Sequence, residues 1–258
     1  MGKTVDDAVR LLSVVSGQDD HDSTSVQASV DFPAPGGGEG LRVGLVTDFL
    51  GEGMDPDVER ATRKAVTVFE RAGATVSEVT LPQNRRFGVS AYYVLAMAEA
   101  STNLAKFCGL RYGASAPLSG SLNAFFSQVR SSNLGAEARR RIILGTFVRM
   151  AGYRDALYVR ALRARQVLLS EFGRAFLSSD VLLHPAMPMP APKTEEALRL
   201  SPSQSYALDL CTVPANLAGL PHASVPWTGK QLPVGVGLTA NALDEKTLVR
   251  AAGILEGW

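Results

Sequence analysis

Two short apolar runs near the C-terminus, 222–227 and 234–240, form the clearest pattern along the chain. Each has the length and β-branched content of a buried strand, and Pro and Gly residues bound both. They predict two core strands joined by a tight turn. A segment of small residues at 212–221 precedes them and can pack close to other backbone. After the strands, a helix is predicted from Asp244 to Leu255.

The N-terminal pattern is helical. Apolar positions between Thr4 and Val15 share one face, Thr4 can cap the first turn, and Gly17 ends the helix. A polar segment and an extended linker follow, up to Gly40. The glycines at 36–38 precede a strand, whereas a phosphate loop follows a strand and opens a helix, so a linker is the better interpretation.

The next section alternates strand, helix and strand. A strand is predicted at 41–46, and Asp55-Pro56-Asp57 begins a helix that Gly73 ends. A second strand is predicted at 75–81. Because a βαβ unit of about 40 residues joins parallel strands, the sheet is expected to be at least partly parallel.

A long helical section follows, and its last helix carries a row of arginines that we interpret as a solvated face. A short strand at 181–183 then runs into a Pro-rich loop at 184–192. The class is therefore α/β, with a mixed β-sheet packed between helices. The four helices of the helical section are predicted at 87–107, 118–129, 136–150 and 153–176.

Composition narrows the function classes. The chain has 258 residues, 46% hydrophobic and 20% charged, which is typical of a globular protein. Its net charge of +1 provides no general electrostatic case for nucleic-acid binding. Cys108 and Cys211 lack a CxxC or a nearby His and are expected to be reduced core residues. With neither a membrane-spanning run nor a secretion signal in the sequence, we expect a cytoplasmic protein without membrane contact.

No familiar catalytic pattern is present. The three histidines do not have the spacing of a metal site or a triad, and the sequence contains no GxSxG, P-loop or GxGxxG–helix motif. On the residues alone we predict no catalytic group and no metal ligand.

Several segments, in order, resemble the amidase signature family. They are Thr212-Val-Pro-Ala-Asn-Leu-Ala-Gly-Leu-Pro221 with Leu232-Pro-Val-Gly-Val-Gly-Leu238, Ala98-Glu-Ala-Ser-Thr-Asn-Leu-Ala105, Arg111-Tyr-Gly113 and Arg140-Arg-Ile-Ile-Leu-Gly-Thr146. The last three are more narrowly similar to the A subunits of glutamyl-tRNA(Gln) amidotransferases. The resemblance covers nearly the whole chain.

The resemblance implies a Ser–Ser–Lys mechanism, in which a lysine deprotonates a bridging serine that activates the nucleophilic serine. Nothing in this sequence matches those residues. Met1-Gly-Lys-Thr4 is similar to a family segment just downstream of them. We therefore expect an incomplete amidase-signature fold that is inactive alone. It would be the C-terminal part of a single domain, with sections at 1–40, 41–82, 86–178 and 180–258.

The resemblance also implies a glutamine site formed by Tyr93, with Tyr92 as the alternative, Arg141 and Asp209. A guanidinium suits an α-carboxylate, and a carboxylate suits an α-ammonium. Without the resemblance, Arg141 would be a surface cation, Asp209 a helix cap and Tyr93 a core residue.

The implied complete enzyme releases ammonia from glutamine to amidate Glu-tRNA(Gln), together with B and C subunits. ATP and Mg²⁺ would be used by the partner subunit, tRNA would be reached indirectly through the complex, and this chain would hold no cofactor. Two alternatives stay open: a fragment of a general amidase acting on another small amide, and a non-catalytic fragment that docks a partner subunit.

Some residues depart from the family pattern. His184 and Met189 stand where threonines are expected, and Arg154 where an aromatic residue usually follows Tyr153. Gly237 replaces a usual glutamine, and Trp227 follows Val-Pro where Cys or Gly is frequent. We expect these positions to lie near the pocket.

Overall fold

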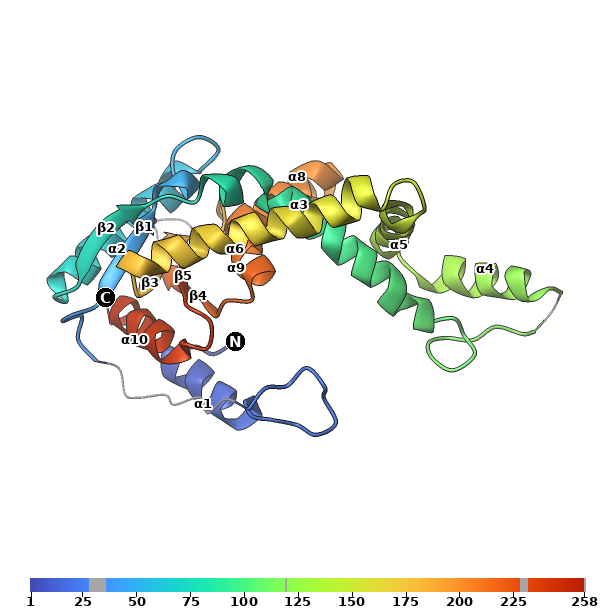
Figure 1. Ribbon diagram of the computed structural model, residues 1–258, viewed down its shortest axis with the longest axis horizontal. Helices are drawn as coiled ribbons and strands as arrows, with labels where there is room; N and C mark the ends of the chain where they lie inside the picture. The colour runs from blue at the N-terminus through green and yellow to red at the C-terminus, as the bar shows by residue number, and fades with distance from the viewer. Residues whose placement is uncertain (28–35, 119, 228–231, 258) are drawn as a thin grey trace. The chain divides into compact units, whose positions relative to one another are not determined.

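The computed structural model describes residues 1–27, 36–118, 120–227 and 232–257. The chain forms two compact units (Figure 1). Unit 1 comprises Met1–Val89 and Val167–Trp258, and unit 2 comprises Ser90–Gln166. The central part of the predicted linker, 28–35, lies outside the described residues, as does position 119 in the predicted second helix of the helical section.

Unit 1 contains a five-stranded mixed sheet in the order β2-β1-β3-β5-β4. β1 runs parallel to both β2 and β3, whereas β5 runs antiparallel to β3 and β4. This confirms the mixed sheet and the parallel βαβ unit. The strands are β1 Arg42–Val46, β2 Thr75–Val79, β3 Val181–Pro185, β4 His222–Trp227 and β5 Val234–Ala240.

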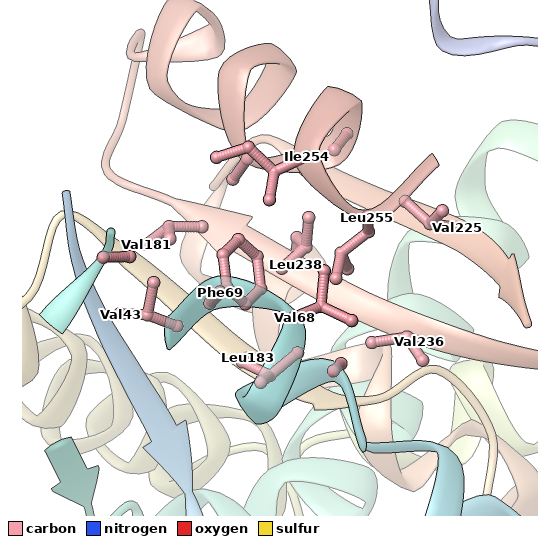
Figure 2. Packing of buried hydrophobic residues seen from close by; sticks show 14 of the residues in the cluster. Val43, Val68, Phe69, Val181, Leu183, Val225, Val236, Leu238, Ile254 and Leu255 are labelled. Carbon is pink, nitrogen blue, oxygen red and sulfur yellow. The ribbon is translucent and has the colours of Figure 1, made fainter. Parts of the chain in front are cut away.

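Two helices with local caps cover one face of the sheet. In α2 (Pro56–Arg71), Asp55 accepts a hydrogen bond from the Asp57 amide at 2.8 Å. In α10 (Glu245–Glu256), Asp244 accepts one from the Thr247 amide. Their apolar sides pack on alternate residues of the strands (Figure 2). That cluster includes Val68, Phe69, Ile254 and Leu255 from the helices and Val43, Leu183, Val236 and Leu238 from the sheet.

A second cluster lies on the opposite face, because successive strand residues point to opposite sides. Leu182 and Val46 point into it, whereas their neighbours Leu183 and Leu45 belong to the first cluster. The C-terminal part of α6 (Arg160–Ser178) contributes Phe172 to the second cluster. The sheet is thus buried between helices, as the α/β class predicts.

Helix α3 (Pro82–Asn103) begins five residues before its predicted start. Glu171 on α6, which is buried, accepts hydrogen bonds from the amides of Gln83 and Asn84 and from the Asn84 side chain, at 2.9–3.0 Å. A carboxylate from a distant part of the chain therefore satisfies the free amides of the first turn.

Unit 2 is helical, as predicted, with shifted boundaries. It contains the C-terminal part of α3, a 3₁₀ turn at Leu104–Lys106, α4 (Leu122–Asn133), α5 (Ala136–Arg149), a π-helical turn at Asp155–Val159 and the start of α6. Gly145 allows close packing of α5 on α3, because an added Cβ would collide with the Met97 carbonyl oxygen.

The segment between β3 and β4 contains short helices that the sequence pattern does not predict. They are α7 Thr194–Arg199, α8 Pro202–Ala207, a 3₁₀ turn at Leu208–Cys211 and α9 Val213–Ala218. Strand β3 also continues through His184 and Pro185, which were predicted to open the Pro-rich loop. A further 3₁₀ turn, Thr47–Phe49, follows β1.

The N-terminal helix α1 (Val5–Val15) forms as predicted, with Thr4 accepting from the Asp7 amide at 3.0 Å. Its apolar face is not buried: Leu11 and Val15 are 54% and 68% exposed. The Val5 amide donates to Glu256 at 2.8 Å, which attaches the start of α1 to the end of α10.

Candidate functional site

Two of the three predicted substrate-binding residues, Tyr93 and Arg141, lie together in unit 2. Tyr93 is on α3 and Arg141 on α5, and the Arg141 guanidinium carbon lies 5.7 Å from the centre of the Tyr93 ring. That separation is within the range of a cation–π contact. Tyr92 packs edge-to-face on Tyr93, with the ring centres 5.2 Å apart.

Glu137 orients the arginine. It lies one turn before Arg141 on α5, and its Oε1 accepts from Arg141 Nε at 2.9 Å. Its other oxygen pairs with Arg140. The sequence prediction missed Glu137, although the i,i+4 spacing of Glu and Arg on a helix was a readable signal. The guanidinium is thus held between a carboxylate and an aromatic face, which limits its rotamers.

The third predicted residue, Asp209, belongs to unit 1. It lies half-buried in the 3₁₀ turn Leu208–Cys211, and its carbonyl oxygen accepts from the Thr212 amide at 3.1 Å. Cys211 in the same turn packs into the second core cluster. The buried Cys211 side chain therefore anchors the turn, and this fixes the position of Asp209 two residues earlier.

The cysteine of this turn is not a nucleophile. Burial raises the pKa of the Cys211 thiol to about 12, so the thiol stays protonated near neutral pH. Its buried position confirms the prediction of a core residue, whereas Cys108 is half-buried; both are free thiols.

A buried polar cluster occupies the face of the sheet opposite α2 and α10. It contains His184 on β3, Thr239 on β5 and His222 on β4, and the two imidazole rings stack with their centres 5.3 Å apart. His184 is only 3% exposed. Burial, with a smaller effect from His222, lowers the pKa of His184 to about 3, and burial also lowers the pKa of His222. Both rings are therefore neutral near pH 7.

The hydrogen bonds then assign each proton. The Pro185 carbonyl can only accept, so His184 Nδ1 donates to it at 2.8 Å. His184 Nε2 must accept, and the Thr239 hydroxyl donates to it at 2.9 Å. The hydroxyl has no second proton, so His222 Nδ1 donates to Thr239 at 3.1 Å. His222 Nε2 remains a buried acceptor without a hydrogen-bond partner among the described residues.

Two of the departures from the family pattern meet in this cluster. His184 and Gly237 are register partners on β3 and β5. A Cβ at position 237 would lie 2.7 Å from Cε1 and 2.8 Å from Nδ1 of His184. The imidazole therefore fills the space that a side chain at position 237 would occupy.

Within the described ranges, no group of three His, Cys, Asp or Glu side chains could hold a metal ion. None of the helices described is long and apolar enough to cross a membrane.

Known proteins similar to this chain agree on one family. The Amidase family model matches residues 1–249. The A subunit of glutamyl-tRNA(Gln) amidotransferase from Brevibacillus brevis is 41% identical, with 98% of this chain and 52% of that protein covered. The corresponding A subunit from Myxococcus xanthus is 42% identical, with 99% and 53% covered. The chain thus spans about half the length of the curated relatives it matches.

Solved structures support the same assignment. The crystal structure of the glutamyl-tRNA(Gln) amidotransferase A subunit from Thermotoga maritima superposes with a TM-score of 0.76 at 32% identity. The match covers 98% of this chain and 51% of the Thermotoga maritima chain. A bacterial aryl acylamidase of the amidase signature family gives the same TM-score at 20% identity, which shows the shared fold. By its sequence over nearly its whole length and by its mixed α/β fold, the chain belongs to the amidase family.

Proposed function

We propose that this chain is the substrate-binding part of a glutamine-dependent Glu-tRNA(Gln) amidotransferase A subunit, and that Tyr93, Arg141 and Asp209 hold glutamine. The contact between Arg141 and Tyr93 carries the proposal. Tyr93 and Arg141 come from different helices, and the Tyr93 ring and the Glu137 carboxylate both contact the Arg141 guanidinium. The similarity to an A subunit over 98% of the chain supports it.

Each residue has a distinct task. The Arg141 guanidinium binds the α-carboxylate, because its planar fork matches two carboxylate oxygens. Tyr93 supports the guanidinium from one side, and Glu137 holds Nε so that the group does not turn away. Asp209 binds the α-ammonium.

The whole enzyme would act in a complex. In this proposal B and C subunits complete it in the cytoplasm, the partner subunit uses ATP and Mg²⁺, and the released ammonia amidates Glu-tRNA(Gln). In this proposal the chain contributes binding of glutamine, and none of its residues is assigned to the Ser–Ser–Lys chemistry.

Glutamine binding to the purified chain tests the proposal, by saturation-transfer NMR and calorimetry. Arg141→Ala should weaken binding roughly ten- to a hundredfold, because a charge-assisted hydrogen bond is worth about 1.5–3 kcal/mol. Arg139→Ala removes an exposed arginine from the same helix and serves as the matched control. Equal effects of the two substitutions, or no binding of glutamine by the wild-type chain, would overturn the assignment.

The contact between His184 and Gly237, two expected departures from the family pattern, favours a second candidate, a general amidase that takes another small amide. An amide without α-amino and α-carboxylate groups needs neither Arg141 nor Asp209. Binding of propionamide that is as tight as that of glutamine and insensitive to Arg141→Ala would support this candidate.

A further inference from the structure

The charges of the chain are strongly separated between the two units. Unit 2, Ser90–Gln166, holds eleven Lys and Arg but only three Asp and Glu, a net charge of +8. The rest of the chain holds fifteen Lys and Arg and twenty-two Asp and Glu, a net charge of −7. The overall charge of +1 is therefore an average over a basic and an acidic unit. The electrostatic case for nucleic acid, absent from the whole-chain charge, exists for unit 2.

A pocket of about 510 Å³ lies within this basic unit. It is lined by α3, the end of α5 and the π-helical turn, and Gly152, with φ +89°, turns the chain between its two arginines. The polar side chains that line it are Glu99, Thr102, Asn103, Arg149, Arg154 and Tyr158.

The two arginines differ in how they are held. Arg149 Nη1 donates to the Ala98 carbonyl and the Ser101 hydroxyl, both at 3.4 Å, and also contacts the Thr102 hydroxyl. Arg154 makes no side-chain hydrogen bond or ion pair within the described residues. One guanidinium is thus fixed to the pocket wall, and the other is available to a ligand.

The donors suit a phosphate group better than a carboxylate. One guanidinium already saturates a carboxylate, whereas a phosphodiester between two guanidinium groups, with hydroxyl and amide donors beside them, uses all of these donors. Glu99 on the same wall repels a bare anion, but it can accept a hydrogen bond from a ribose 2′-hydroxyl.

Exposed aromatic residues accompany the positive charge. Tyr112 is 56% exposed and Tyr153 is 47% exposed, and Tyr153 packs against Phe147 with ring centres 4.5 Å apart. Exposed rings within a basic surface are the platforms on which unpaired bases stack.

We propose that unit 2 binds RNA directly and that the Arg149–Arg154 pocket takes one of its backbone phosphates. The geometry stands independently of the proposed glutamine site, because none of the pocket residues belongs to that site. Direct binding of RNA by unit 2 also differs from the expectation that tRNA is reached only indirectly, through partner subunits.

Fluorescence anisotropy with the purified full chain and a fluorescein-labelled RNA hairpin tests the proposal across a salt series. Arg154→Gln should weaken binding roughly three- to tenfold at low salt. It should also reduce the slope of log affinity against log salt by about one phosphate contact. Arg174→Gln, which removes an exposed arginine from the unit 1 part of α6, is the matched control and should leave both values unchanged. Circular dichroism verifies that each variant is folded.

Four outcomes would overturn the proposal. The first is no RNA binding by the wild-type chain at low salt, and the second is an equal effect of the two substitutions. The third concerns the ligand: adenosine monophosphate that binds in an Arg154-dependent way while RNA does not would assign the pocket to small phosphates. Poly-glutamate that displaces RNA at equal charge concentration would assign the surface to an acidic protein.

Discussion

At the scale of single residues, His184 and Gly237, two of the expected departures from the family pattern, lie in contact. Neither residue is explained by itself: His184 is a buried imidazole where a threonine is expected, and Gly237 is a glycine inside a core strand. The cross-strand register places them face to face, with the ring in the space a side chain at 237 would need. A single sequence shows both departures but not their contact, because register is a tertiary property.

Gly237→Ala should therefore destabilise the protein by roughly 1–3 kcal/mol, the usual cost of overpacking a rigid site. Urea unfolding at pH 7 measures the change. His184→Thr in the same chain should recover most of the loss, because the smaller side chain vacates the space.

Gly173→Ala is the control for this prediction, since an added Cβ there meets nothing within 4 Å and the residue is exposed on α6. It should be neutral or stabilising by up to about 1 kcal/mol. A Gly237→Ala variant as stable as Gly173→Ala would show that the imidazole moves away at no cost.

The same histidine predicts a dependence of stability on pH. The folded pKa of His184, about 3, lies below its ordinary value of 6.5, so the unfolded chain binds more protons between these values. Stability is complete above the unfolded pKa and falls as the pH drops from 6.5 toward 3. The slope is up to about 1.4 kcal/mol per pH unit for each such histidine.

Urea unfolding of the wild-type chain at pH 7, 6 and 5 should show this decline, and His184→Thr should make it shallower. His21→Gln, at an exposed histidine, is the control. A His184→Thr profile parallel to that of the wild type would mean that other groups cause the acid sensitivity.

At the scale of elements, helix starts that are capped by a neighbouring residue were predicted correctly. The start of a helix that is capped by a residue far along the chain was not. Thr4 and Asp55 cap the helices that they were predicted to begin, and Asp244, predicted as the first residue of the last helix, caps that helix. The start of α3 was misplaced because its first-turn amides are satisfied by Glu171, which lies 88 residues from Gln83 and 87 from Asn84. No local pattern can reveal such a cap.

Glu171→Ala should lower the free energy of unfolding by roughly 2–4 kcal/mol. The substitution removes the hydrogen-bond acceptor of the Gln83 amide, the Asn84 amide and the Asn84 side chain, which lie in or beside the protein interior. Glu171→Gln keeps one acceptor oxygen and should cost less. Thermal and urea unfolding measure both, with Glu70→Ala on the exposed side of α2 as the control. A Glu171→Ala loss no larger than the control would remove Glu171 as the anchor of α3.

The short helices between β3 and β4 escaped prediction for a different reason. Six-residue helices such as α7 and α8 are too short for a hydrophobic period to appear. The start of α8 was nevertheless readable, because Ser201 and Gln204 form a capping box and Pro202 occupies the first turn. Asp209, in the turn that follows, was predicted to bind substrate only from the family resemblance.

At the scale of the whole molecule, the overall composition does not show the difference in charge between the two units. The α/β class, the mixed sheet and both C-terminal strands were predictable, since their apolar runs are short, bounded and strongly patterned. The basic and acidic units were not, because the acidic unit is assembled from the two ends of the chain. The contact between Tyr93 and Arg141 likewise requires α5 to pack on α3.

The purified 258-residue chain should release no ammonia from glutamine. A serine hydroxyl becomes a nucleophile only with a base within hydrogen-bond reach. Among the described residues, no lysine side chain hydrogen-bonds to a serine, and the buried Ser179 hydroxyl lies against Gly44 with no partner. A coupled ammonia assay measures turnover, with glutamine binding by the same preparation as proof that the site is folded. Release of ammonia that Arg141→Ala abolishes would place the nucleophile within these residues. Binding without turnover would instead separate recognition of glutamine from its hydrolysis and assign only the recognition to these residues.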